Sequence, residues 1–593
     1  MYKEKRREEK RTLAFVLTLC GSAMLSTGVA RGQFSYFELP NPGQTRWWIV
    51  PLGAPCGCAS RTPSIANSIN DCGEIVGETG DNSYCPQHAW VWTLCETLPQ
   101  IDARSMQGIG ALTDAYDNFP ETAEAAANAI NNDAVVVGSL SHISLAEQAP
   151  FWWNLLSTTT NPACSSSSCA CGIALSDYVT MSIGNAVAPG SVTAISESAN
   201  PALVGTFAQS ASPSGASQAW ISHALTQSGS TLLLPIQGVP NTIHESAASA
   251  VSFVGNAFRV AGASRNKSPT ASRTGADDAV TWVPSFSTNA LSLSEPNAAG
   301  VGLWSERALG SNDFGDICGA AFVAPSFETE TAVWWTANGA AFDVGTLFSP
   351  ATSSARALSE RDTLGNAIAC GDSGANSIPP QTFVWWTKPS PRFPVAPNTP
   401  FHGVDFADPL MSVNFMPGVA PGCMLCPKLV ALRGINARGW MVGATFLSSH
   451  IEQQAALVLP APCQADFDND GFVNASDLAT LMNAWGSCAS GISGYCVGDL
   501  NDDGIIGAQD LSALLNAWTK DDPTPCSLNS LCDTFNCRGS GVALRATRSD
   551  VLIAISRYDC SCCEEFGWLV GSLCEETQRA VVADVEFQLR GNQ

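Results

Sequence analysis

Short hydrophobic runs recur along most of the chain, and each run is bounded by Asn, Asp, Gly or Pro. Some runs alternate apolar and polar positions, and others are apolar throughout, as in AVVVG at 134–138 and APFWW at 149–153. Both patterns favour β-strands, because runs this short between turn residues are more typical of strands than of amphipathic helices. The pattern predicts a mainly β protein built from many short strands.

A two-part motif repeats along these strands. The first part ends in glycine, as in SIANSINDCGEIVG (64–77) and AAANAINNDAVVVG (125–138), and the second is an aromatic strand, such as AVWW (332–335). The glycines that end the first part stand 52 to 72 residues apart; they are Gly77, Gly138, Gly205, Gly262, Gly319, Gly371 and Gly443. A constant motif with variable spacing indicates one repeated frame that carries loops of different length.

One such unit is too small to bury both faces of its sheet, so neighbouring units must stack. Seven units of about four strands predict a seven-bladed β-propeller over residues 33–460, with a β-solenoid as the alternative. The fifth unit continues into a further strand, AAFDVG (340–345), that the seventh unit lacks, and WWIVPLG (47–53) resembles the missing piece. This favours a ring closed by the N-terminal strand, because closure removes an exposed sheet edge.

Over roughly residues 45 to 460, these motifs resemble the HAF family of extracellular repeats. Units of that family read H-A-F-x-W, then D-L-G, then A-x-x-I-N-x-x-G-x-V-V-G, and units one, two, five, six and seven carry the pattern most clearly. The resemblance implies an extracellular location and no defined reaction.

Two acidic twelve-residue stretches follow the repeats, DFDNDGFVNASD at 466–477 and DLNDDGIIGAQD at 499–510. An EF-type calcium loop needs oxygen ligands at positions 1, 3, 5, 7, 9 and 12 and a glycine at position 6. Both stretches fit, and they predict two bound calcium ions. The second ion is expected to be held less firmly, because Gly507 replaces a side-chain oxygen at position 9. The predicted ligands are Asp466, Asp468, Asp470, Phe472, Asn474 and Asp477 in the first loop, and Asp499, Asn501, Asp503, Ile505 and Asp510 in the second.

An apolar helix is predicted after each loop, in LATLMNAWG (478–486) and LSALLNAWT (511–519), with the leucines and Trp485 or Trp518 facing a core. Paired loops of this kind, each ending in Asp and followed by one helix, resemble the type I dockerin module over residues 461–526.

The dockerin resemblance implies that the module folds when it binds calcium and that it docks to a cohesin-like protein. The module is expected to recognise this partner mainly through positions 10 and 11 of its loops. Those positions are Ala475 and Ser476 in the first loop, and Ala508 and Gln509 in the second. Because the two pairs differ, we expect that the two halves do not bind a partner equivalently.

The two ends of the chain suggest export. Residues 1–32 are predicted to be a signal peptide, with a charged start, an apolar run at 13–25 and small residues near the expected cleavage site. The run is too short for a membrane span. In an exported chain, the remaining cysteines favour disulfides over metal sites, and residues 527–593 are predicted to be a Cys-rich segment of unassigned role.

The formal net charge of −24 and the lack of a basic stripe argue against nucleic-acid binding. No HExxH, GxSxG or phosphate-loop motif occurs. We therefore expect a secreted or cell-surface protein that is not an enzyme and that binds or displays a polysaccharide or cell-surface ligand. The alternative is a carbohydrate-active enzyme of the glycoside hydrolase type, which needs two carboxylates about 5–10 Å apart. Candidate carboxylates for that reaction are Glu78, Asp102, Glu306 and Asp343.

Overall fold

A computed structural model describes the central part of the 593-residue chain. The described residues are 47–53, 63–80, 89–95, 107–108, 123–142, 148–156, 179–180, 190–208, 217–223, 230–235, 243–267, 277–293, 303–323, 330–345, 352–375, 378–387, 403–405, 412–414, 428–446, 453–487 and 498–519. Within these ranges, residues 199, 286, 363–364, 462, 469–471 and 502 are not described. The predicted signal peptide, Asp102, Asp470 and the segment 527–593 lie outside these residues.

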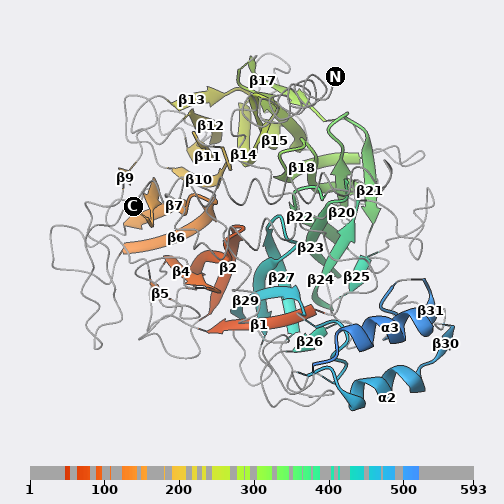
Figure 1. Ribbon diagram of the computed structural model, residues 1–593. Coiled ribbons are helices and arrows are strands. Elements are labelled where there is room, and N and C mark those ends of the chain that lie inside the picture. Colours follow the sequence, from red (N-terminus) through yellow and green to blue (C-terminus); the bar gives the residue numbers. More distant parts are fainter. Residues whose placement is uncertain are drawn as a thin grey trace, which may run out of the picture. The chain divides into compact units, whose positions relative to one another are not determined.

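The described strands of the repeat region form seven sheets, one for each repeat unit, and we number these blades along the chain (Figure 1). Blade one contains β2 (Ser64–Ile69), β3 (Glu74–Thr79), β4 (Ala89–Thr93) and β5 (Gln107–Gly108). Blade two contains β6 (Ala123–Ile130), β7 (Val135–His142), β8 (Gln148–Asn154) and β9 (Val179–Thr180). Blade three contains β10 (Gly190–Ile195), β11 (Ala202–Ala208), β12 (Ser217–His223) and β13 (Ser230–Leu233). Blade four contains β14 (Ile243–Val254), β15 (Ala257–Lys267), β16 (Asp277–Val283) and β17 (Ser287–Ser292). Blade five contains β18 (Leu303–Ser311), β19 (Ile317–Val323), β20 (Glu330–Trp335) and β21 (Ala341–Gly345). Blade six contains β22 (Thr352–Leu358), β23 (Ile368–Ala375), β24 (Ile378–Trp386) and β25 (Gly403–Asp405). Blade seven contains β27 (Lys428–Ile435), β28 (Met441–Phe446), β29 (Gln453–Pro460), β1 (Trp47–Gly53) and β26 (Ser412–Asn414).

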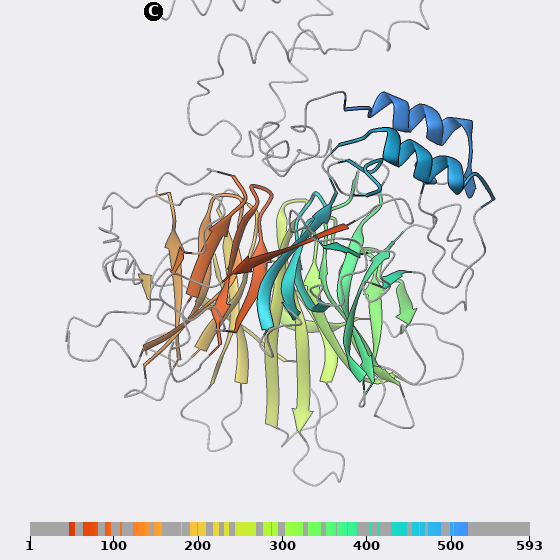
Figure 2. The same cartoon turned by 90° about the horizontal axis from the view of Figure 1, so that it is seen from below.

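The seven blades close into a ring. The first strand of each blade contacts the first strands of both neighbours, and β2 of blade one contacts β27 of blade seven. These seven strands therefore surround the centre of the ring. Figure 2 views the ring from its edge and shows the blades side by side. The fold is a seven-bladed β-propeller, as the repeat predicts, and the β-solenoid alternative is wrong because a solenoid would leave its two end units apart.

Blade seven combines the two ends of the repeat region. Strand β1 pairs antiparallel with β29, with Trp48 opposite Leu459 and Val50 opposite Leu457. The predicted closure by the N-terminal strand is confirmed (Figure 1). Strand β26 adds a further, parallel strand to the outer side of β1, which the sequence pattern does not predict.

The glycine that ends each first motif has a steric cause. Opposite every one of these seven glycines, the first strand of the blade carries an irregularity in register. A Cβ atom at Gly138 would lie 1.9 Å from the Ala126 carbonyl oxygen and 2.8 Å from the ring of Phe151. A Cβ atom added at any of the other six glycines would lie 1.9–2.0 Å from a first-strand carbonyl oxygen. Only glycine fits where the backbones approach this closely.

The aromatic strands supply the core between blades. Trp90, Trp220, Trp282 and Trp335 are fully buried. One cluster joins Val76 and Val91 of blade one to residues of blade two, and the other clusters likewise include residues from neighbouring blades. Aromatic side chains of the second motif therefore lie in the core between blades.

The segment after the propeller contains helices α2 (Ala475–Asn483) and α3 (Ala508–Asn516) and the short strands β30 (Gly486–Ser487) and β31 (Ile505–Ile506). Both helices begin three residues before the predicted apolar stretch, because Asn474 and Gly507 inside the loops are their N-caps. Trp518 packs against the small core, as predicted. The core prediction is wrong for Trp485, which follows the end of α2 and is 47% exposed, and for Leu515 of α3, which is 51% exposed.

The two halves of this segment are linked in an equivalent way. Val473, at position 8 of the first loop, accepts a hydrogen bond from the Thr519 backbone N–H (3.0 Å). Ile506, at position 8 of the second loop, pairs with Gly486. In each case the residue that follows one helix binds the loop of the other half, so each half completes its partner.

The five cysteines among the described residues divide into two groups. Cys72, Cys95 and Cys463 are disulfide-bonded, as expected for an exported chain. Cys318 and Cys370 depart from that expectation, because both are free and buried. Burial raises the pKa of the Cys318 thiol to about 12, so this group stays protonated and behaves as a small apolar core residue.

Among the described residues, no helix has the length and apolar character that crossing a membrane requires.

Candidate metal centre

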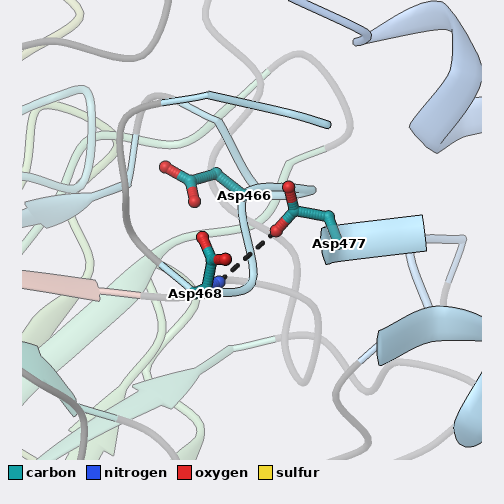
Figure 3. Close-up of side chains that lie close together, drawn as sticks. All are labelled: Asp466, Asp468 and Asp477. Carbon is teal, nitrogen blue, oxygen red and sulfur yellow. Dashed lines mark hydrogen bonds between the residues drawn. The ribbon is translucent and has the colours of Figure 1, made fainter. Parts of the chain in front are cut away.

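The first acidic loop brings three carboxylates together. Asp466, Asp468 and Asp477 each offer an oxygen atom, and these atoms lie within 4.8 Å of one another (Figure 3). Asp466 and Asp477 are buried, and Asp468 is half-buried. Three negative charges at this spacing repel one another unless a cation lies among them.

Asp477 holds the loop in this shape. Its Oδ1 atom accepts hydrogen bonds from the backbone N–H groups of Phe467 (2.5 Å) and Asp468 (3.4 Å), and its Oδ2 atom accepts one from Asn474 (2.9 Å). One carboxylate thus ties the start of the loop to its end, and Figure 3 shows its bond to Asp468. Asn474 in turn caps α2 by accepting a hydrogen bond from the Ser476 N–H at 2.8 Å.

The electrostatics of this loop favour a positive ion. Burial raises the pKa of the Asp477 carboxyl, and the nearby charge of Asp468 raises it further, against the lowering effect of the backbone hydrogen bonds. Both raising effects disfavour the ionised form when no cation is near. A bound cation would reverse the second effect, because it would offset the repulsion between the carboxylates.

The second loop has the same internal frame. Asp510, at position 12, accepts hydrogen bonds from the N–H groups of Leu500 (2.6 Å) and Asn501 (3.2 Å) at one end and from Gly507 (2.7 Å) at the other. Asp499, at position 1, accepts from the Gly504 N–H at 2.9 Å. Gly504 has a φ of +85°, which glycine adopts readily, so the sharp turn expected at position 6 is present.

The two loops differ in how their charges gather. Within the part of the chain that the structure describes, only the first loop places three carboxylates within 4.8 Å. In the second loop, position 3 is Asn501, whose Nδ2 group donates to Asp503 Oδ2 at 3.0 Å and to the Gln509 side chain. Position 9 is Gly507, which offers no side-chain oxygen. The second loop therefore carries less negative charge at the positions that face an ion.

The donor set of the first loop fits calcium. All of its side-chain donors are oxygen atoms, and hard cations such as Ca²⁺ prefer carboxylate, amide and carbonyl oxygens. Phe472 occupies position 7, where an EF-type loop uses the backbone carbonyl, and Ile505 occupies the same place in the second loop. Asp470 belongs to the same predicted set but lies outside the described residues.

The four predicted docking residues lie at the beginnings of the helices. Ala475 and Ser476 start α2, Ala508 and Gln509 start α3, and all four are exposed. The two pairs do not have the same surroundings, because the Gln509 side chain accepts a hydrogen bond from Asn501 across its own loop. The structure therefore places both pairs at equivalent positions with different side-chain contacts.

The carboxylates considered for glycoside hydrolysis are spread over the propeller. Glu78 lies on β3 of blade one, whereas Glu306 and Asp343 belong to blade five. Glu306 is on the innermost strand of its sheet and Asp343 on the outermost, three strand spacings or about 14 Å apart. Asp343 also accepts hydrogen bonds from the Thr331 hydroxyl (2.6 Å) and the Gly345 N–H (2.8 Å). These three residues do not form the close pair that this chemistry needs.

Another group of carboxylates, Asp71, Glu197, Asp313 and Glu360, lies in the hairpins of the propeller and is not among the predicted site residues. Each follows the Asn or Ser of the first motif, in IND, ISE, SND and LSE. The recurrence of an acidic residue at this position of the motif is the sequence feature from which these four carboxylates could have been predicted as a group. Their convergence depends on ring closure, which brings hairpins from distant parts of the chain together.

A comparison with protein-family models finds no match, and no curated protein matches the chain. Among solved structures, the chain is similar to a prolyl endopeptidase, with 10% identity and a TM-score of 0.36 over 68% of this chain and 51% of that one, so it spans only about half of that enzyme's length. It is also similar to a variant of the Aleuria aurantia lectin in complex with α-methyl-L-fucoside (12% identity, TM-score 0.27, 55% of this chain and 94% of that one). A third is Penicillium chrysogenum α-L-arabinanase complexed with arabinobiose (8% identity, TM-score 0.30, 70% and 98%). At these identities and TM-scores, the likeness does not bear on ligand or reaction.

Proposed function

We propose that this protein is a secreted or cell-surface β-propeller that binds or displays a ligand without catalysing a reaction, and that its calcium loops form a docking module of the dockerin type. The observation that supports the proposal most strongly is the convergence of Asp466, Asp468 and Asp477 in a loop whose frame of hydrogen bonds recurs around Asp510. Duplicated loops joined through their helices are suited to organising a small fold around two ions.

Calcium is proposed as a structural ion. The small core of the segment is centred on Val473, Leu481, Ile506 and Leu514. A core of this size supplies limited stability by itself, and bound metal is a common way to supplement it. We expect the first loop to bind calcium more tightly than the second, because it gathers more carboxylates.

The proposed partner is a cohesin-like protein, recognised through the exposed first turns of α2 and α3. The first turn of α2 presents Ala475 and Ser476, while that of α3 presents Ala508 and Gln509. A partner that binds one pair closely would meet a longer amide side chain in the other pair. The two halves are therefore proposed to bind with different strengths.

The spread of carboxylates supports a propeller without glycosidase activity. Glu306 and Asp343 lie on opposite edges of one sheet, and Glu78 lies on a different blade. The chemical class proposed for the propeller's ligand is a polysaccharide or another cell-surface molecule. Secretion through residues 1–32 and membership of the HAF repeat family form part of the same proposal.

The proposal predicts that the full chain binds an immobilised cohesin domain, from a panel of such domains, in calcium and not in chelator. Calcium should be required because the helix starts that carry the docking residues are part of the ion loops. The variants Ala475→Asp/Ser476→Asp and Ala508→Asp/Gln509→Asp should weaken binding unequally, as measured by surface plasmon resonance. Binding that persists in chelator, or equal losses in the two variants, would contradict the proposal.

A further inference from the structure

The blades are joined at one end of the ring by hydrogen bonds between hairpins. Each of these hairpins connects the first and second strands of a blade. The Asn436 amide donates to the Asn70 carbonyl (3.0 Å), Asn70 donates to the Asn131 carbonyl (2.9 Å), and Asn131 donates to the Ser196 carbonyl (3.3 Å). A buried amide in one blade is thus satisfied by the backbone of the next, and this links blades seven, one, two and three.

A second set of bonds in the same hairpins uses carboxylates. Asp71 accepts from the Ala437 N–H (2.8 Å), and Glu197 accepts from the Asn132 N–H (2.8 Å). In both cases a blade's carboxylate binds the backbone of the blade before it. The carboxylate therefore helps to hold two neighbouring blades together.

Blades four, five and six continue this pattern. Asp313 accepts from the Phe253 N–H (2.7 Å), and Glu360 accepts from the Asp313 N–H through both of its oxygen atoms (2.9 and 3.1 Å). We call Asp71, Glu197, Asp313 and Glu360 the axial carboxylates, because their hairpins follow the strands that surround the centre of the ring.

The axial carboxylates repel one another across the ring. Burial raises the pKa of Glu197 well above its ordinary value, and the charges of Asp71, Asp313 and Glu360 raise it further. Burial likewise raises the pKa of Glu360, with added repulsion from Asp313 and Asp71. The pKa of Asp313 is raised by burial first and then by Asp71, against the lowering effect of its bond to Phe253. Four carboxylates from four blades thus behave as one electrostatic group.

Nearby positive charges do not balance this group. Arg361 forms a bidentate ion pair with the buried Asp316 (2.6 and 2.7 Å), which neutralises that carboxylate. Arg259, on β15, donates to the Gly315 carbonyl at 2.8 Å. Arg438, in the hairpin between β27 and β28, is the cation that interacts with Asp71, and burial lowers its own pKa to about 10.

Among the residues that the structure describes, the hairpins of blades two, four and six add no cation other than Arg361. The hairpin of blade two contributes the amide of Asn132 and the carboxylate of Asp133, and the end of β14 in blade four contributes the backbone N–H of Phe253. Asp362, in the hairpin of blade six, accepts from the Asn366 N–H at 2.7 Å. Negative charge is therefore in excess at this end of the ring.

We propose that three of the axial carboxylates, Glu197, Asp313 and Glu360, make the closure of the propeller respond to pH, so that protons that they take up in mild acid strengthen the contacts between blades. A protonated carboxyl group keeps an oxygen that can accept the N–H of the neighbouring blade, so the bonds survive while the repulsion is lost. This device is independent of the calcium loops and of any docking partner.

The direction of the effect follows from proton linkage. A carboxyl group whose pKa is higher in the folded than in the unfolded chain takes up its proton first in the folded chain. Stability therefore rises as pH falls through the raised pKa, until the unfolded chain is protonated as well near the ordinary value of about 4.3 for Glu. Most proteins behave in the opposite way, because paired carboxylates destabilise them on protonation.

The test compares the full chain with Glu360→Gln, which removes one charge and keeps an oxygen for the Asp313 N–H. Thermal unfolding is followed by tryptophan fluorescence at neutral pH and at about pH 5.5 in constant calcium. The unchanged chain should gain about 2 °C in Tm at the lower pH. Glu360→Gln should be more stable than the unchanged chain at neutral pH and should gain less on acidification. The control Asp343→Asn, on the outer strand β21, should leave the pH dependence unaltered.

A second measurement does not depend on unfolding. Potentiometric titration of the folded chain between neutral pH and about pH 5.5 should record less proton uptake in Glu360→Gln than in Asp343→Asn. Equal uptake would overturn the proposal. A Glu360→Gln chain that is less stable at neutral pH would also overturn it, because this result would mean that a bound cation, rather than protons, offsets the charges.

Discussion

The Ile49→Asp variant is expected to lose roughly 4 kcal/mol of folding free energy, enough to make the propeller marginal or unfolded. Ile49 is fully buried in β1, and its cluster includes Trp386 of blade six and Val458 of blade seven. An ionised carboxylate there would be desolvated in the core that joins two blades. Since β1 is also the strand that closes the ring, the damage should spread beyond one sheet.

Urea unfolding followed by tryptophan fluorescence measures this loss. The matched control is Leu291→Asp, which places the same side chain on the outer strand β17 at a position that is 56% exposed. The control should change the free energy of unfolding by no more than about 0.5 kcal/mol. Comparable losses in the two variants would mean that β1 does not close the ring as described.

The Gly138→Ala variant is expected to destabilise the propeller by roughly 3 kcal/mol. The added methyl group would lie 1.9 Å from the Ala126 carbonyl oxygen, and backbone on both strands would have to move to relieve this contact. The suitable control is Gly339→Asn, in a turn where φ is +85° and no atom lies within 4 Å of an added Cβ. Asn tolerates that conformation, so the control should remain close to the unchanged chain in thermal unfolding. If Gly138→Ala also retained the stability of the unchanged chain, the steric account of the repeat would fail.

The repeat predicts the ring well because it records contacts that every blade makes. The glycines of the first motif mark the close approach of two strands, and the aromatic residues mark the core between blades. The incomplete seventh unit predicts the closing strand for the same reason. By contrast, β26 is a three-residue segment without hydrophobic periodicity, and only its place beside β1 makes it a strand.

Spacing alone selects the candidate ion ligands from the sequence, and the structure brings three of them, Asp466, Asp468 and Asp477, close together. The sequence does not reveal that Asp477 and Asp510 each hold both ends of their loop through backbone N–H groups. It also does not reveal the exposure of Trp485, because helical periodicity continues past the point where α2 ends. The axial carboxylates required three-dimensional closure, which no local pattern contains.

Calcium titration of the full chain by calorimetry is the most direct test of the central claim that these loops are ion sites. We expect two binding events, with the tighter one abolished in Asp477→Ala and the weaker one abolished in Asp510→Ala. Asp343→Asn, which lies in the propeller, should bind as the unchanged chain does. An absence of calcium binding in the unchanged chain, or the same binding after both loop substitutions are combined, would contradict the account.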